Sequence, residues 1–441
     1  MKPTIKQTAL AAAAAAALFA SAAGQAQSPQ ASVTEQRAVG AFTAIAASVP
    51  YNMVIKTQGA AALSLSGPKE KIDRIETVIS GDTLIIRGKS GPHLEWTIGK
   101  KADPITIVVT APRLNALKLS GSGDVEVSQV AGEQFSIDST GPGDLQVSGA
   151  VRDLRVNSSG SGDVSLERLA ATNTRVSMTG PGDVAVAGGA GQFSADSGGS
   201  GDLTVSGLRA TRVEARLHGP GDVSLAGSSR ELKVDVSGSG DFKACHLIVE
   251  AVNANLTGPG EGCIGGATKA LEAQVSGSGD LAVSGLQAAK ANVRLRGPGN
   301  LELSGAVGAL SATVSGSGSL EAERLNVGSA ELRSSGPGEI HLATISDTLT
   351  LHLSGSGGIS AALAAKSADI DMGGPGAVSL RGTVGALKAR LHGSGNLEAR
   401  SLVATTSNTQ IDGPGQAYVN KSHHKSHHKS HHQRGNADSA R

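Results

Sequence analysis

Eight aspartates occupy the same place in a repeated glycine-rich turn, and carboxylates repeated in this way could bind calcium. Each follows the first glycine of its turn by three places, as in Gly121-Ser122-Gly123-Asp124. The eight are Asp124, Asp144, Asp163, Asp183, Asp202, Asp222, Asp241 and Asp280. Calcium takes oxygen ligands, and some secreted repeats hold it in Gly- and Asp-rich turns. Alternatively, each carboxylate accepts hydrogen bonds from nearby backbone N–H groups and fixes its turn.

Later copies of the turn favour the second interpretation. The equivalent places hold Asn300, Ser319, Glu339, Gly358, Ala377, Asn396 and Gln416, yet the repeat continues. Glycine and alanine offer no side-chain oxygen, so a calcium ligand cannot be required at every turn. We therefore predict that the aspartates fix turns, and we expect neither calcium nor another cofactor in the repeats.

A histidine-rich segment near the end of the sequence offers a second set of possible ligands. Lys-Ser-His-His occurs three times in succession from Lys421, and the histidines are His423, His424, His427, His428, His431 and His432. Neutral imidazoles at this density chelate Zn²⁺, Ni²⁺ or Cu²⁺, so adventitious binding of these metals is expected. Alternatively, residues 420–441 form a disordered tail that gains positive charge as the pH falls towards about 6. The first interpretation would suit a periplasmic metal-handling protein.

The sequence contains two cysteines, Cys245 and Cys263, and their separation is close to the length of one repeat. In an oxidising compartment they could form a disulfide between neighbouring repeats. They stand at registers that differ by two places, however, and this favours two unpaired thiols over a disulfide.

We predict no catalytic residues. Cleavage of an acidic polysaccharide, the main enzymatic alternative, needs a clustered acid/base pair in a groove. The acids here are spread evenly, Trp96 is the sole tryptophan, and four histidines are solitary near turns: His218, His341, His352 and His392. The Gly-x-Gly turns begin no helix, so they lack the converging amides of a nucleotide site.

The elements that position these residues repeat sixteen times. The residue after the first glycine alternates between Ser and Pro, and a longer and a shorter spacing between turns alternate almost throughout. Apolar residues fall four and six places after that glycine, and six, four and two places before the next one, as in Leu232, Val234 and Val236. This alternation predicts two half-buried strands joined by a loop in each repeat.

Strand pairs this short must stack on their neighbours, so the sequence predicts an all-β fold, a parallel β-helix. Its repeats average about 19.5 residues and pair into units of about 39 residues. We favour a wide four-stranded coil that contains one such unit, which would stack Pro on Pro and Ser on Ser. Narrower coils of one repeat remain the alternative. The layer spacing predicts a body about 38 Å long for eight wide coils and about 77 Å for sixteen narrow ones.

The rest of the sequence divides around these repeats. Residues 1–26 resemble a secretory signal peptide, 27–37 are expected to be a linker, and 38–120 a strand-rich cap over one end of the stack. The β-helix is predicted over 121–419. With 39 basic and 38 acidic residues the net charge is +1, which gives no reason to expect nucleic acid as a partner. The sequence predicts no membrane span.

The run from Pro104 to Leu114, followed by Leu119-Ser120-Gly121-Ser122-Gly123-Asp124-Val125, resembles the putative autotransporter adhesin, head GIN domain family. The strands at 51–55 and 81–86 fit the same pattern, and the resemblance spans about residues 38 to 415. It implies a secreted bacterial β-helix, suggests adhesion, and brings no catalytic residues. We therefore expect a non-catalytic periplasmic, secreted or cell-surface protein whose partner is an envelope protein or a glycan. The oligomeric state is not predicted.

Overall fold

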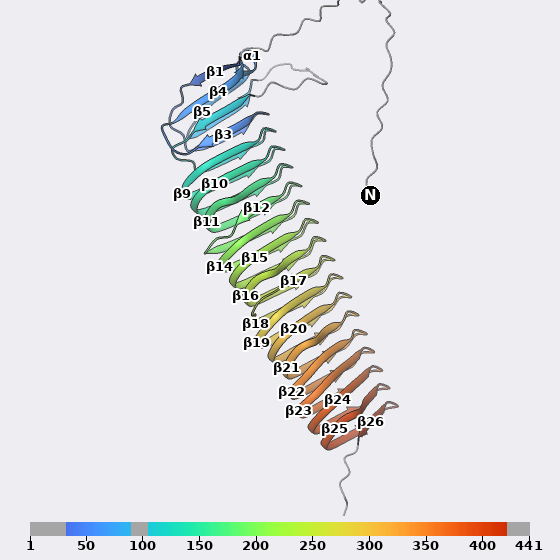
Figure 1. Cartoon of the computed structure of the whole chain (residues 1–441). Helices are drawn as coiled ribbons and strands as arrows, with labels where there is room; N and C mark the ends of the chain where they lie inside the picture. The colour runs from blue at the N-terminus through green and yellow to red at the C-terminus, as the bar shows by residue number, and fades with distance from the viewer. Residues whose placement is uncertain (1–31, 90–104, 421–441) are drawn as a thin grey trace, which may run out of the picture.

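The computed structural model describes residues 32–89 and 105–420, and these form one continuous stack of β-strands (Figure 1). The predicted signal peptide, residues 27–31, Trp96 and the histidines of the tail lie outside the described residues. One short helix, α1 (Lys69–Ile72), is the sole α-helix in the described part of the chain. The all-β parallel β-helix predicted from the repeats is therefore confirmed.

Eight strands precede the repeats: β1 (Ser32–Arg37), β2 (Ala44–Ser48), β3 (Asn52–Lys56), β4 (Ala62–Pro68), β5 (Ile75–Ser80), β6 (Thr83–Gly88), β7 (Thr106–Thr110) and β8 (Ala116–Leu119). The first repeats form β9 (Val125–Ser139), β10 (Leu145–Ser158), β11 (Val164–Met178), β12 (Val184–Ala187), β13 (Gln192–Ser197), β14 (Leu203–Leu217), β15 (Val223–Val236), β16 (Phe242–Leu256), β17 (Gly262–Ile264) and β18 (Ala270–Val275). The later repeats form β19 (Leu281–Leu295), β20 (Leu301–Val314), β21 (Leu320–Ser334), β22 (Ile340–Leu353), β23 (Gly358–Met372), β24 (Ala377–Leu391), β25 (Asn396–Ile411) and β26 (Gln416–Asn420).

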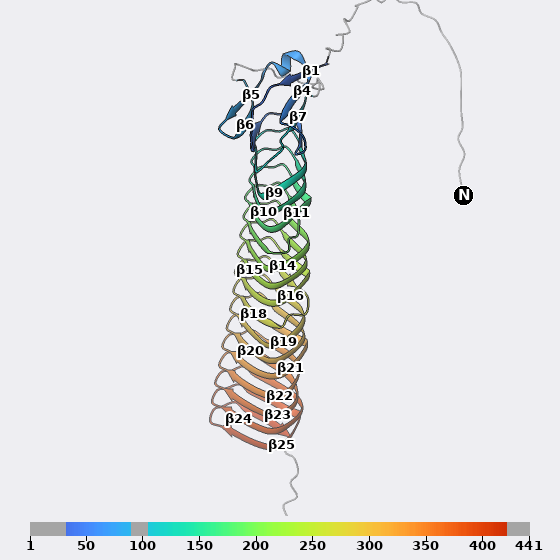
Figure 2. The same ribbon diagram turned by 90° about the vertical axis from the view of Figure 1, so that its left-hand side faces the viewer.

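Each coil of the β-helix contains one repeat, so the predicted wide coil of two repeats is wrong. Consecutive repeats pair in parallel, with Val125 opposite Leu145 and Leu145 opposite Val164. The two views at right angles show a single slender column of such coils (Figure 2). Turns containing Ser and turns containing Pro therefore lie on one another.

A β-bulge accounts for the alternating spacing that suggested the wide coil. Between the pairs Val127–Val147 and Val130–Gly149, β9 has two residues where β10 has one. The extra residue lengthens its coil by one place without changing the partners of the other residues. In agreement with this, β23 and β24 belong to two successive repeats of the shorter spacing, and they pair without any register shift. Where the spacing alternates, it thus records a bulge in every second coil.

The apolar positions predicted from the sequence form the core. Leu232, Val234 and Val236 are at most 2% exposed, and the same places are buried in every coil from β9 to β24. The segment between the two expected strands is also extended, because it pairs with the same segment of the next coil. In β14 the inward residues are accordingly Leu203, Val205, Leu208, Ala210, Val213, Ala215 and Leu217. The expected loop is therefore a strand, and most repeats form one long bent strand.

The glycine turns stack in columns because their backbones approach closely. A Cβ added to Gly141 would clash with the carbonyl oxygen of Gly121, and one added to Gly160 would clash with that of Gly141. No side chain fits between these layers, so glycine is required there for close approach.

The N-terminal strands continue the stack and then close it. On one side β3 pairs with β9 and β7 with β3, both in parallel, before β4 and β1 add antiparallel strands. On the other side β8, β2 and β6 follow in parallel and β5 adds an antiparallel strand. Residues 32–37, predicted as part of a linker, are therefore strand β1, which pairs with β4 along its whole length.

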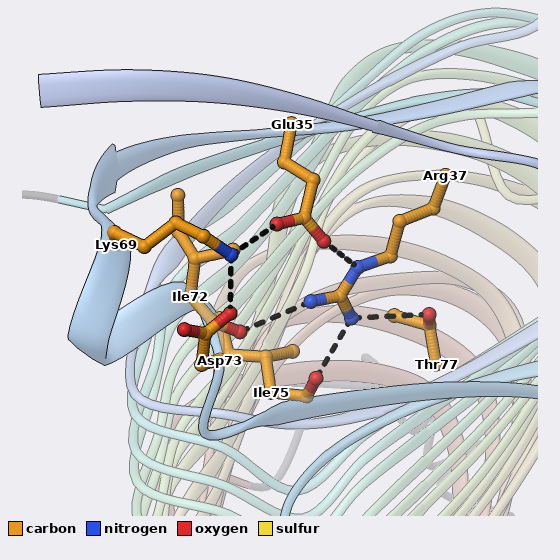
Figure 3. A network of polar contacts seen from close by, with 7 residues as sticks. All are labelled: Glu35, Arg37, Lys69, Ile72, Asp73, Ile75 and Thr77. Carbon is orange, nitrogen blue, oxygen red and sulfur yellow. Dashed lines mark hydrogen bonds and ion pairs between the residues drawn. The ribbon is translucent and has the colours of Figure 1, made fainter.

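A polar network fastens β1 to this closed end (Figure 3). Arg37 donates hydrogen bonds to the carbonyl oxygens of Ile72 and Ile75 at 3.0 and 2.7 Å and forms an ion pair with Glu35 at 2.8 Å. Lys69 of α1 joins Glu35 to Asp73 at 3.2 and 2.6 Å. Hydrogen bonds from Arg37 and Lys69 lower the pKa of the Glu35 carboxyl below its ordinary value. The network therefore holds β1, α1 and β5 together.

Candidate functional site

The structure brings the eight predicted aspartates into one column along the solenoid. Each carboxylate from Asp124 to Asp241 accepts a hydrogen bond from the backbone N–H of the equivalent residue in the next coil. Asp163 Oδ1, for example, accepts from the N–H of Asp183 at 2.9 Å. The sequence suggested that each aspartate fixes its own turn, but the bonds run between turns.

The column continues where asparagine replaces aspartate. Asn300 accepts from the N–H of Ser319 at 2.9 Å, as the carboxylates do. At Asp222, burial raises the pKa, but hydrogen bonds from Lys243 and from the N–H of Asp241 lower it below the ordinary value. Among the described residues, no three His, Cys, Asp or Glu side chains are placed to hold a metal ion. Calcium binding at this column stays untested, and hydrogen bonds between successive turns account for the geometry of the column.

Replacing Asp183 tests this interpretation. Asp183→Ala removes the acceptor for the N–H of Asp202, which lies at 2.8 Å, and should cost about 1 kcal/mol. Asp183→Asn should cost less, because its carbonyl oxygen can accept as that of Asn300 does. Urea denaturation with and without calcium provides the measurement. A rise in stability on adding calcium, lost in both variants, would instead establish a calcium site.

Cys245 and Cys263 form a disulfide between neighbouring coils, rather than the two free thiols that the sequence favoured. In the ladder Cys263 lies opposite Lys243, so Cys245 is its diagonal neighbour. Their Cα atoms are 5.2 Å apart, a normal separation for a disulfide. A register difference of two places is therefore compatible with a bond.

A polar groove of about 820 Å³ lies over five successive layers near the N-terminal end of the solenoid. Its outward side chains alternate with buried Phe135, Leu154 and Thr174, so the strand pleat presents them on one face. They are Asn115, Glu133, Gln134, Ser136, Asp153, Arg155, Asn173, Arg175, Gln192 and Ser194.

The carboxylates at this groove are already paired. Arg152 forms ion pairs with Glu133 at 2.9 Å and with Asp153 at 3.0 Å. Asp153 also accepts from the side-chain amide of Asn173 at 2.7 Å, and the Asn173 oxygen accepts from the N–H of Gln192 at 3.1 Å. Hydrogen bonds from Asn173 and Arg152 lower the pKa of the Asp153 carboxyl, which keeps it ionised and paired.

Arg155 and Arg175 have no such partner. They stand opposite each other on β10 and β11, and both are exposed. Within residues 32–89 and 105–420, no hydrogen bond or ion pair to either guanidinium is found. Two like charges on neighbouring strands repel each other. The groove therefore presents two guanidinium groups that form no ion pair with the described residues, beside a set of amide groups.

The four histidines that are solitary in the sequence all lie beside carboxylates. His218 is 3.3 Å from Asp196, and His352 is 3.5 Å from Asp371. His392 lies within 3.7 Å of Asp371 and Asp412. The sequence missed the pairs of His218, His352 and His392 because their partners come from adjacent coils.

His341 has the most suggestive surroundings for catalysis. Its Nδ1 is 2.8 Å from Ser360 Oγ and its Nε2 is 3.0 Å from Glu339. Serine, histidine and glutamate in this order resemble a triad for acyl transfer, but that reaction also requires free hydrogen-bond donors that stabilise the oxyanion. The strands that carry His341 and Ser360 pair directly in the ladder, which uses their backbone N–H groups. This trio therefore resembles a catalytic arrangement only in part.

Arg155 and Arg175 are functional candidates that the sequence analysis missed. Both follow an inward residue by one place in successive repeats, which was visible in the sequence. Their proximity follows only once each coil is known to contain a single repeat.

The fold and these surfaces define a class of protein: a parallel β-helical repeat protein with polar columns and an open groove on its outer face. The chain belongs to the family described as "Putative auto-transporter adhesin, head GIN domain", which matches residues 41–190, 148–225, 174–286, 263–345 and 343–426. No curated protein matches the chain. No helix in the described residues is long and apolar enough to cross a membrane.

Solved structures with similarity to this chain include two described as putative adhesins. One from Bacteroides fragilis is 17% identical, with 69% of this chain and 97% of that chain covered and a TM-score of 0.24. One from Parabacteroides distasonis is 16% identical, covering 66% and 96%, with a TM-score of 0.34. A structure described as a putative lipid binding protein, also from Parabacteroides distasonis, is 16% identical, covering 69% and 96%, with a TM-score of 0.29.

Proposed function

We propose that this protein is a non-catalytic, adhesin-like protein of the bacterial cell envelope that binds an extended anionic glycan in the polar groove. The observation that carries the proposal is the pair Arg155 and Arg175, which lie opposite each other on neighbouring strands and have no ion-pair partner among the described residues. A ligand carboxylate or sulfate would supply the missing negative charge and accept hydrogen bonds from both guanidinium groups.

The other groove residues suit the neutral part of such a ligand. Asn115, Gln134 and Gln192 offer amide donors and acceptors to hydroxyl groups. The layers repeat about every 4.8 Å, so an elongated polymer could make the same contacts on successive coils. The one aromatic residue in the lining, Phe135, is 1% exposed and offers no stacking surface. Binding at one groove should therefore be weak, and strong attachment would require several copies.

The proposed location rests on the family and on the sequence before the described residues. Membership of an adhesin family suits a protein outside the cytoplasm, and residues 1–26 have the composition of a secretory signal peptide. The disulfide is consistent with an oxidising compartment. A protein partner in the envelope is the second ligand class that this location allows.

Arg175→Ala is the sharpest test of the groove. Removing one of two cations should weaken binding of an acidic polysaccharide, such as polygalacturonate, at least about tenfold, the equivalent of about 1.4 kcal/mol. Calorimetry or a glycan array gives the measurement. The matched control is Arg381→Ala, because Arg381 is an exposed cation of β24 that has no ion-pair partner among the described residues and lies outside the groove. This control should bind like the unchanged protein.

Three outcomes would contradict the proposal. Equal loss in both variants would indicate non-specific charge attraction, and binding that survives Arg155→Ala together with Arg175→Ala would place the ligand elsewhere. Turnover of the polysaccharide, abolished by a single carboxylate substitution, would make the protein an enzyme.

A further inference from the structure

The two ends of the solenoid differ. At the N-terminal end, antiparallel strands and α1 cover the stack. At the other end β26 pairs only with the first part of β25, up to Val403. From Ala404 to Ile411, no described strand pairs with the outer edge of β25. A sheet edge is thus left open in the part of the chain that the structure describes.

The open edge has free backbone groups of known direction. The N–H of Asp412 donates to the carbonyl oxygen of Leu391 in the preceding coil at 2.8 Å. Because backbone groups alternate along a strand, the N–H and C=O of Ser407, Thr409 and Ile411 point away from that coil, towards the open side. Unpaired groups of this kind form a template for another strand.

The composition of this last coil is unusual for an edge. Residues 401–420 contain a single charged residue, Asp412, although 17% of the whole sequence is charged. Natural edges are usually protected by charge or proline, and neither occurs between 401 and 411. Three large apolar side chains are also exposed in this coil, Val403 at 55%, Ile411 at 45% and Tyr418 at 39%.

The inward side chains of β25 suit partial exposure to water, while the backbone edge of this strand is not blocked. The inward column that holds Leu387 and Ala389 in β24 continues as Ser407 and Thr409 in β25. Small polar residues lower the cost of an exposed end. Thr409 also has a high β-propensity, and neither Ser407 nor Thr409 prevents the strand from pairing with another strand.

We propose that this edge pairs with the same edge of a second copy of the chain, forming an antiparallel, tail-to-tail dimer about a two-fold axis. Residues 404–411 carry no charge, so two copies can align without like-charge repulsion. An edge that pairs with its own copy about a two-fold axis is fully used in the pair, so the assembly stops at two copies instead of growing into a filament. This inference rests on the edge alone and is independent of the proposed glycan site.

Sedimentation velocity on the chain from residue 27 onward tests the dimer. The unchanged protein should form a dimer at micromolar concentration. Ser407→Pro with Thr409→Pro removes two outward N–H donors and no hydrogen bond to β24, so it should raise the dimer dissociation constant at least tenfold. The matched control, Ser407→Ala with Thr409→Ala, keeps both donors and should remain dimeric. Circular dichroism verifies that both variants fold.

A second variant keeps the proposal falsifiable if the proline variant unfolds. Asn408→Lys places a charge on the edge strand, whereas Ser311→Lys places one in the same outward column of an internal coil. Only the first should dissociate the dimer. A monomer at all concentrations would overturn the proposal, as would a dimer unaffected by either edge variant. A monomer that dimerises only after deletion of residues 421–441 would also overturn it, by placing that segment on the edge.

Discussion

Gly374→Ala is expected to destabilise the protein by about 3 kcal/mol or more. A Cβ on Gly374 would clash with the carbonyl oxygens of Ser354 and Gly355 in the preceding coil. Both obstacles are backbone atoms, so the new methyl group cannot be accommodated by a change of rotamer. The layers must separate, and the hydrogen bond from Gly374 N–H to Leu353 O, at 3.3 Å, is strained with them.

The neighbouring glycine provides a matched control. A Cβ on Gly373 would meet no atom within 4 Å, and its backbone is not in the left-handed region. Gly373→Ala should therefore change stability by less than about 1 kcal/mol and could raise it. Urea denaturation compares the two variants, and hydrogen exchange shows whether protection is lost first in β23 and β24. Equal effects would mean that close stacking of the turns does not limit stability.

The strand pattern was predictable because one physical rule governs every repeat. A residue either faces the narrow interior or faces water, so Val125 and Leu232 could be assigned to the core from spacing alone. Coil width was not predictable in the same way. A one-residue bulge in alternate coils and a wide coil of two repeats give the same spacing, and only the pairing of Val127 with Val147 separates them.

The candidate site was partly predictable for a related reason. The aspartates could be identified from the sequence, since each belongs to a recognisable glycine-rich turn motif. Arg155 and Arg175 belong to no such motif, and their proximity depends on the register of β10 with β11. The sequence favoured unpaired thiols because alignment of the repeats places Cys263 opposite Lys243 and not opposite Cys245. The diagonal contact that allows the disulfide is seen only in the folded structure.

Removing the disulfide is the second change with a large expected effect. Cys245→Ser with Cys263→Ser should lower the free energy of unfolding by about 3 kcal/mol, since the bond closes a loop with a sequence separation of 18. The bond also lies where the ladder is weakest. Strand β17 has only three residues, and residues 265–269 between β17 and β18 are not in a strand. Loss of the bond should therefore open this coil first.

Guanidinium denaturation in the presence and absence of a reducing agent measures the effect. Reduction should destabilise the unchanged protein to the level of the double variant and should leave the variant itself unaffected. The coil of β12 and β13 supplies an internal control, because it is also interrupted, between Ala187 and Gln192, but has no disulfide. Its hydrogen-exchange protection should not respond to reduction, whereas that of β17 and β18 should fall. Equal protection of β17 and β18 in both redox states would show that stacking alone holds this coil, since a cross-link that limits local opening must alter exchange when it is broken.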